Sequence, residues 1–122
     1  MKDKEDCFTK AMAFIEEEQY DKAVYLLKTL ADEGHAKAQY NLGLCYAFGN
    51  GLMQYEAKAA ELFRKSAEQG NPDAQFELGL CYDFGKGLEK DKSKATQWYR
   101  RAAEQRNEGA QQRLDELWRR QQ

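Results

Sequence analysis

Small and apolar residues recur along the chain at spacings of three and four positions, and no segment shows the two-residue alternation of a β-strand. Between residues 36 and 48 the recurring positions are Ala38, Leu42, Cys45 and Tyr46, and between residues 72 and 84 they are Ala74, Leu78, Cys81 and Tyr82. Each set falls on one side of a helix, where it can pack against a neighbouring helix. The pattern predicts an all-α chain.

The same pattern is an internal repeat. Residues 38–52, AQYNLGLCYAFGNGL, return 36 positions later at residues 74–88 as AQFELGLCYDFGKGL, and a weaker third copy begins at Ala110. A repeat of this length is typical of a solenoid, in which each unit buries its apolar face against the next unit. Each full copy ends in a Gly-x-Gly, which stops the helix and reverses the chain because glycine tolerates positive φ.

The expected architecture is a single solenoid domain that spans residues 1–122. It consists of three antiparallel helix hairpins, at about 4–34, 36–70 and 72–106, and a C-terminal capping helix at about 108–120, which makes seven helices. The first hairpin has no Gly-x-Gly before Asp21 and should be tighter than the others. Asp91 is predicted to cap the second helix of the third hairpin, whereas Tyr55 occupies the equivalent position in the second.

Composition limits the possible functions. The chain is 42% hydrophobic and 33% charged, with a net charge of −2, so a globular fold without general attraction to nucleic-acid phosphates is expected. No apolar run approaches the roughly 18 residues that a membrane span needs, and the N-terminal residues do not resemble a secretory signal. We therefore expect a cytoplasmic monomer with no nucleic-acid or membrane partner.

The residues that carry chemistry are sparse. Cys45 and Cys81 share one repeat position and are predicted to be packing residues, because stacked repeats hold equivalent positions beyond disulfide distance. His35 stands alone, and no Cys-x-x-Cys is present, so neither a metal nor a cofactor is expected. No nucleophile lies at a defensible spacing from a base, and no phosphate loop accompanies the glycine pairs. The chain is predicted not to be an enzyme.

The repeat resembles a known family on specific residues. The Sel1-like repeat, a relative of the tetratricopeptide repeat, has the pattern A-x-x-x-L-G-x-x-Y-x-x-G-x-G-[VL], followed after a gap by A-x-x-[WLF]-[YF]-x-x-[AS]-A-E-x-G. Two nearly full copies are present here, from Ala38 to Gly70 and from Ala74 to Ala103, and Arg106 replaces the final glycine in the second. The opening hairpin resembles the tetratricopeptide form instead. The resemblance implies a right-handed α/α superhelical solenoid whose first helices line a concave surface.

Carrying the tetratricopeptide register over to this sequence gives a set of residues that would face the concave groove. The candidate partner-binding residues are Phe8, Met12, Lys37, Tyr40, Leu44, Phe48, Asp73, Phe76, Leu80, Asp83 and Phe84, and the same register adds Glu5, Glu16, Gly109, Gln112 and Glu116. The set contains one aromatic row and one aliphatic row. Two interpretations remain open: the rows are an exposed binding stripe, or they pack between neighbouring inner helices.

Several functions are compatible with this surface. The leading hypothesis is a protein-protein interaction module, an adaptor or scaffold that binds a peptide or an amphipathic helix with basic flanks, since Glu16, Asp73 and Asp83 lie at the groove margins. The alternative is a small cytosolic inhibitor, such as an immunity protein that neutralises a toxin, a role that some members of the resembled family have. An engineered repeat protein and an enzyme that depends on His35 are more remote.

Overall fold

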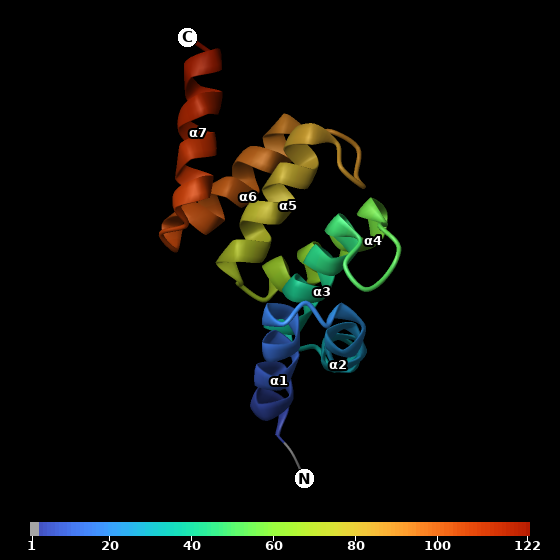
Figure 1. The fold of residues 1–122 in the computed structure, drawn as a ribbon. Helices are drawn as coiled ribbons and strands as arrows, with labels where there is room; N and C mark the ends of the chain where they lie inside the picture. The colour runs from blue at the N-terminus through green and yellow to red at the C-terminus, as the bar shows by residue number, and fades with distance from the viewer. Residues whose placement is uncertain (1–2) are drawn as a thin grey trace.

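The computed structural model describes residues 3–122, and over this range it consists of seven α-helices and no strand (Figure 1). The helices are α1 (Lys4–Glu16), α2 (Tyr20–Asp32), α3 (Ala36–Phe48), α4 (Glu56–Glu68), α5 (Pro72–Phe84), α6 (Lys92–Glu104) and α7 (Glu108–Arg120). Successive helices pair as α1 with α2, α3 with α4 and α5 with α6, and α7 packs on α6. The predicted all-α solenoid class is confirmed.

Side chains that accept from free backbone N–H groups fix where the helices begin. Nδ1 of His35 accepts from the Ala38 N–H at 3.1 Å at the start of α3, and asparagine oxygens do the same for α5 and α7. Asp91 caps α6 by accepting from the Lys94 N–H, as predicted, whereas Tyr55 gives α4 no side-chain cap. His35 is thus a structural residue of the fold.

The two glycines of each Gly-x-Gly have different roles. Gly49 and Gly85 end α3 and α5 in the left-handed conformation, with φ of 71° and 69°. The second glycine, Gly51 or Gly87, lies against the first residue of the preceding hairpin's second helix. A Cβ atom on Gly87 would come within 2.3 Å of the carbonyl oxygen of Glu56, so only glycine permits this approach. The turns therefore set the stacking of the hairpins. The first hairpin lacks this device and reverses over residues 17–19 alone.

Contacts between successive helices hold the stack together. Each helix from α2 to α6 contacts the helix before it and the helix after it, and α5 also contacts α7 (Figure 1). Within each full repeat a ring of the second helix lies over a glycine of the first, Phe63 over Gly43 and Tyr99 over Gly79. Both rings are buried. The small residue in the LGLCY sequence is thus required by the close helix packing.

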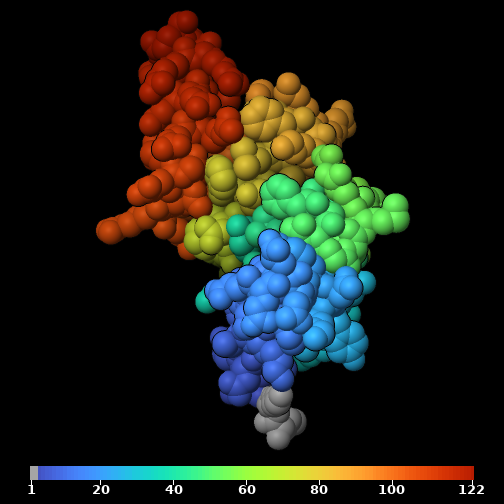
Figure 2. Space-filling view, viewed as in Figure 1, coloured from blue at the N-terminus to red at the C-terminus, as the bar shows by residue number. Residues whose placement is uncertain are grey.

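The first helix, α1, and the last, α7, lie at opposite ends of an elongated molecule (Figure 2). Trp118 of α7 occupies the repeat position of Tyr46 and Tyr82, which are partly buried against the hydrophobic clusters. Its side chain is 65% exposed, because no second helix follows α7 within residues 3–122. Cys45 and Cys81 are free and buried, which confirms their predicted packing role.

Candidate partner-binding face

We call the side formed by α1, α3, α5 and α7 the inner face. The candidate residues on it differ in exposure. Lys37, Phe48, Asp73 and Phe84 are exposed, Phe8, Met12, Tyr40, Leu44, Phe76 and Leu80 are partly buried, and Asp83 is buried. Phe48 is 71% exposed and Phe84 is 44% exposed, both at the C-terminal ends of their helices. The inner face therefore has open positions at the helix ends and partly closed positions between them.

The aromatic row packs toward neighbouring helices. Phe8 stacks on His35 with ring centroids 5.0 Å apart, Tyr40 lies 6.1 Å from Phe63, and Phe76 lies 6.1 Å from Tyr99. The Phe76 ring also lies under α7, where a Cβ atom on Gly109 would come within 2.9 Å of it. These rings are partly buried, and their contacts with neighbouring side chains stabilise the stack.

The aliphatic row behaves in the same way. Leu44 packs on the hydrophobic cluster between α3, α4 and α5, and Leu80 packs on the cluster that α6 and α7 complete. Met12 is partly buried and belongs to none of the three clusters. Each of the two interpretations of the apolar rows thus describes part of the face.

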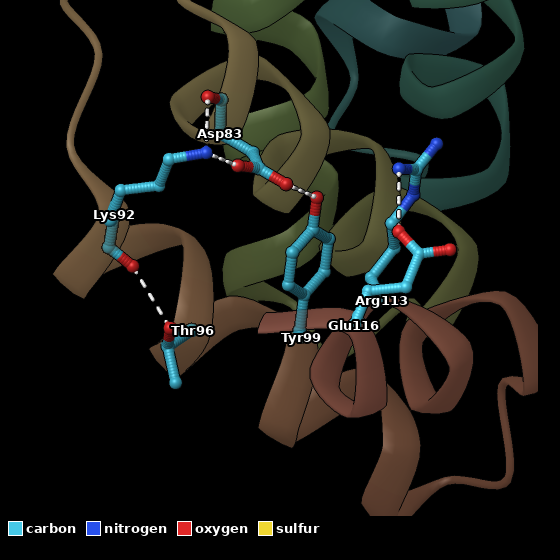
Figure 3. A network of polar contacts seen from close by, with 6 residues as sticks. All are labelled: Asp83, Lys92, Thr96, Tyr99, Arg113 and Glu116. Atoms are coloured by element: carbon cyan, nitrogen blue, oxygen red, sulfur yellow. Dashed lines mark hydrogen bonds and ion pairs between the residues drawn. The ribbon is translucent and has the colours of Figure 1, made fainter. Parts of the chain in front are cut away.

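Asp83 does not line an open groove, and its expected exposure is wrong. Its side chain is 2% exposed, because it accepts a hydrogen bond from Oη of Tyr99 at 2.8 Å and an ion-paired hydrogen bond from Nζ of Lys92 (Figure 3). Burial alone would raise the pKa of Asp83, but the hydrogen bonds from Lys92 and Tyr99 outweigh burial and lower it. Burial and the hydrogen bond to Asp83 together raise the pKa of Tyr99.

A sequence signal for this buried network was available. In the second repeat the three equivalent positions hold Ala47, Glu56 and Phe63, and in the third they hold Asp83, Lys92 and Tyr99. The phenol, the carboxylate and the ammonium all appear in the third repeat and not in the second, and the buried carboxylate and phenol would each be costly without a hydrogen-bond partner. Comparing the copies position by position would have predicted the network.

Sequence reasoning also missed a cavity at the junction of the second and third hairpins. It has a volume of about 230 Å³ and lies between the α3–α4 hairpin and α5. Its lining residues are Ala47, Phe48, Gln54, Glu56, Ala59, Phe63, Glu77, Leu80, Cys81 and Lys86. Two of these, Phe48 and Leu80, belong to the candidate partner-binding set. The cavity therefore opens a specific recess in the wall of the inner face.

Glu77 is the distinctive polar residue of this cavity. Its side chain is partly buried, and within residues 3–122 no hydrogen bond or ion pair engages its carboxylate. Burial raises the pKa of Glu77, the Lys86 charge opposes that shift and the Asp73 charge adds to it. On the adjacent α3, burial and the charges of Glu77 and Asp73 raise the pKa of Tyr40 to about 12. The α3–α5 side of the inner face is thus locally acidic.

Other kinds of site have little support in residues 3–122. No group of three or more His, Cys, Asp or Glu side chains there is arranged to hold a metal ion. None of the helices has both the length and the apolar character that crossing a membrane requires.

Stacked helix hairpins joined by glycine turns define an α-solenoid built from helical repeats. The Sel1 repeat model matches residues 15–35, 36–71 and 72–107, and the chain therefore belongs to the Sel1 repeat family. Sel1 repeats generally serve as protein-protein interaction modules on a helical scaffold that is typically non-enzymatic. A search of curated proteins gives no match.

Solved structures agree with this assignment. A Sel1 repeat protein from Oxalobacter formigenes is 33% identical, with a TM-score of 0.85 over 93% of this chain and 89% of that one. A protective antigen of uropathogenic Escherichia coli strains that displays an SLR fold is 32% identical, with a TM-score of 0.92 over 96% of this chain but 26% of the antigen. Helicobacter pylori cysteine rich protein B, 24% identical with a TM-score of 0.70 over 73% of this chain and 67% of that one, shares the fold.

Proposed function

We propose that this protein is an adaptor or scaffold that binds a peptide or helix of a partner protein in the concave groove of its inner face. The observation that carries the proposal is the partly open apolar surface that continues from α1 through α5. Helical solenoids use such surfaces to bind extended or helical segments, and an amphipathic helix matches rows of aromatic and aliphatic side chains. Asp73 and Glu77 favour a partner segment that carries basic residues.

The proposal also covers the cellular compartment and the oligomeric state of the protein. The three free thiols of Cys7, Cys45 and Cys81 favour a reducing compartment, so we place the protein in the cytoplasm, as a monomer without catalytic activity of its own. An inhibitor, such as an immunity protein, would use the same face and would differ in that its partner is a toxin. The identity of the partner therefore separates the two roles.

The test changes the groove without emptying the core. Met12→Lys combined with Leu44→Lys places two charges in the aliphatic row, while the long lysine stems retain much of the packing. The matched control, Tyr25→Lys with Thr29→Lys, adds the same charge to exposed positions of α2, where Tyr25 is 74% exposed. Wild-type protein and both variants are used to co-purify partners from the native organism, and mass spectrometry identifies the partners.

We expect a stoichiometric partner with the wild type and the control, and an affinity about 30-fold lower with the groove variant, as for loss of an interface hot spot. Circular dichroism verifies that all three proteins are equally helical. A partner that the groove variant binds as tightly as the wild type does would refute binding through this face. Recovery of a toxin as the stoichiometric partner would favour the inhibitor.

A further inference from the structure

Within residues 3–122 the stack has three junctions: between the first and second hairpins, between the second and third hairpins, and between the third hairpin and α7. One position of the repeat distinguishes them. Near the end of each hairpin's first helix, at equivalent positions, the chain has Ile15, Ala47 and Asp83. Ile15 packs on the first hydrophobic cluster, and Asp83 is buried in its polar network. Ala47 has neither bulk nor a hydrogen-bonding group, and the cavity of about 230 Å³ lies beside it. The second junction is thus the one with a recess at this position.

The third junction fills the corresponding space with the chain's own cations. Nζ of Lys92 bonds to Asp83, and the same atom lies 5.7 Å from the centre of the Phe84 ring. The guanidinium of Arg113 lies 5.2 Å from that ring and is paired with Glu116 (Figure 3). Aromatic rings attract cations through the negative potential of their faces. Cations therefore occupy the third junction at the end of α5.

At the second junction, acidic residues stand at the positions of these two cations. Phe48 takes the place of Phe84, and Glu56 and Glu77 take the places of Lys92 and Arg113. No cation of residues 3–122 lies over the Phe48 ring, which is 71% exposed. The aromatic ring and the carboxylates line the cavity, and the cation among its lining residues, Lys86, forms no ion pair with either carboxylate.

We propose that the cavity beside Ala47 is an anchor site for an arginine side chain of the partner peptide, with the guanidinium bonded to Glu77 and stacked on Phe48. This inference rests on the proposed function, since it names the chemistry that the groove recognises. Arginine fits better than lysine because its planar fork can bind a carboxylate through two hydrogen bonds and stack on an aromatic ring at once. The aliphatic stem would lie against Leu80.

The surroundings of Glu77 support this assignment. A partly buried carboxylate without a partner is costly, and a cation that enters the cavity removes that cost. Lys86 lies near enough to lower the pKa of Glu77, but it forms no ion pair with it, and its Nζ lies 5.9 Å from the centre of the Phe84 ring. Glu56 and Asp73 add further negative charge nearby. The site is thus electrostatically complementary to one incoming cation.

The direct test uses two small molecules of nearly identical shape. N-acetyl-arginine amide and its neutral analogue N-acetyl-citrulline amide are titrated into the isotopically labelled full chain, and NMR chemical shifts are followed. We expect saturable shifts at the cavity residues with the arginine compound, and binding at least about tenfold weaker with citrulline, as for loss of a charge-assisted hydrogen bond. Equal affinities for the two compounds, or no saturable shift with either, would overturn the inference.

Three variants sharpen the result. Glu77→Gln should reduce the arginine affinity to the citrulline level, whereas Glu68→Gln, an exposed carboxylate outside the cavity, should leave it unchanged. Ala47→Ile introduces the side chain that Ile15 has at the equivalent position of the first junction. It should fill the recess and abolish binding while the protein stays helical. Arginine binding that persists at full strength in Glu77→Gln or in Ala47→Ile would also overturn the inference.

Peptide selection separates this inference from the proposed function. A random peptide library is displayed and selected on the wild type, and each binder is measured again on Glu77→Gln and on the Met12→Lys, Leu44→Lys variant. Binders that contain arginine and lose affinity in Glu77→Gln support the anchor site. Binders that lose affinity in the Met12→Lys, Leu44→Lys variant, but contain no arginine and keep their affinity in Glu77→Gln, refute the anchor site alone. Saturable arginine binding without any groove-dependent binder contradicts the proposed function alone.

Discussion

Replacing Asp83 by alanine should lower the free energy of unfolding by about 2–3 kcal/mol, through the groups that the carboxylate now engages. The hydroxyl of Tyr99 belongs to a fully buried side chain and would lose its acceptor, which costs about 1–3 kcal/mol. The ammonium of Lys92 would lose its partner as well. Its side chain is 46% exposed, so water can solvate it, and the cost stays below the roughly 3–5 kcal/mol of a fully buried pair.

A second substitution distinguishes this account from simple loss of packing. Ala47 and Phe63 occupy the equivalent positions of the second repeat, so the chain already contains an apolar version of the same site. Adding Tyr99→Phe to Asp83→Ala removes the orphaned hydroxyl and should restore stability to within about 1 kcal/mol of the wild type. The cycle should therefore give a coupling free energy of about 2 kcal/mol between the two side chains.

Urea unfolding measures these free energies. Far-UV circular dichroism reports all helices, and fluorescence reports Trp98 and Trp118 in the C-terminal part, so agreement of the two transitions tests whether the repeats unfold together. A double variant no more stable than Asp83→Ala would refute the orphaned hydroxyl as the cause. A loss below about 0.5 kcal/mol for Asp83→Ala would refute the network as a source of stability.

The same network predicts a dependence on pH. Because the pKa of Asp83 is lower in the folded chain than its ordinary value of 3.8, the folded state binds fewer protons than the unfolded state. The carboxylate's contribution is therefore complete above that ordinary value and is lost as the pH falls through the lower folded value. The stability difference between the wild type and Asp83→Ala should shrink in acid. A difference that stays constant or grows there would contradict the lowered pKa.

Three other substitutions test the local structure by the same urea titration. Arg106 has a φ of 67° where the two earlier repeats have glycine, so Arg106→Gly should stabilise by up to about 1 kcal/mol, and a loss would contradict the strain. Tyr55→Asp copies the cap that Asp91 gives α6 and should raise the free energy of unfolding by about 1 kcal/mol. No gain would show that water already accepts from the free N–H groups at the start of α4. Gly79→Ala should cost about 1–3 kcal/mol despite its better helix propensity, because its Cβ atom would come within 2.5 Å of the Tyr99 ring, and a neutral result would show that the ring moves freely.

The sequence was sufficient to predict most of the fold, because the repeat presents the same physical requirements more than once. Two copies of LGLCY followed by Gly-x-Gly fix a helix, its glycine end and a second helix, and the structure ends α3 and α5 at Gly49 and Gly85 as predicted. The tight first hairpin followed from a missing glycine pair. The approach of Gly87 to the carbonyl of Glu56 could not be predicted, because it joins two hairpins whose relative placement is a tertiary property.

The candidate site was harder to predict for a related reason. Register states which helix face a residue occupies, but burial depends on which side chains the neighbouring helices place opposite that face. Asp83 was expected at the groove margin and is instead buried, because Lys92 and Tyr99 of α6, the second helix of the same hairpin, lie opposite it. Glu77 was not selected at all, because position 77 lies outside the tetratricopeptide register that gave the groove positions.

These two residues indicate where functional information lies in a repeat protein of this kind. The glycines that pack each hairpin and stack it on the one before are the same in both full copies: Gly43 and Gly79 lie under rings of their own hairpin, and Gly51 and Gly87 lie against the backbone of the preceding one. Since these contacts hold the stack, the positions near the end of each first helix can change without loss of the fold. At this position the first junction has the apolar Ile15, the second has Ala47 beside a cavity, and the third has the polar network of Asp83. A recess beside an unpaired carboxylate adds nothing to stability. Binding is the property that such an arrangement can serve, and the differences between the copies are therefore a better guide to a partner than their shared sequence.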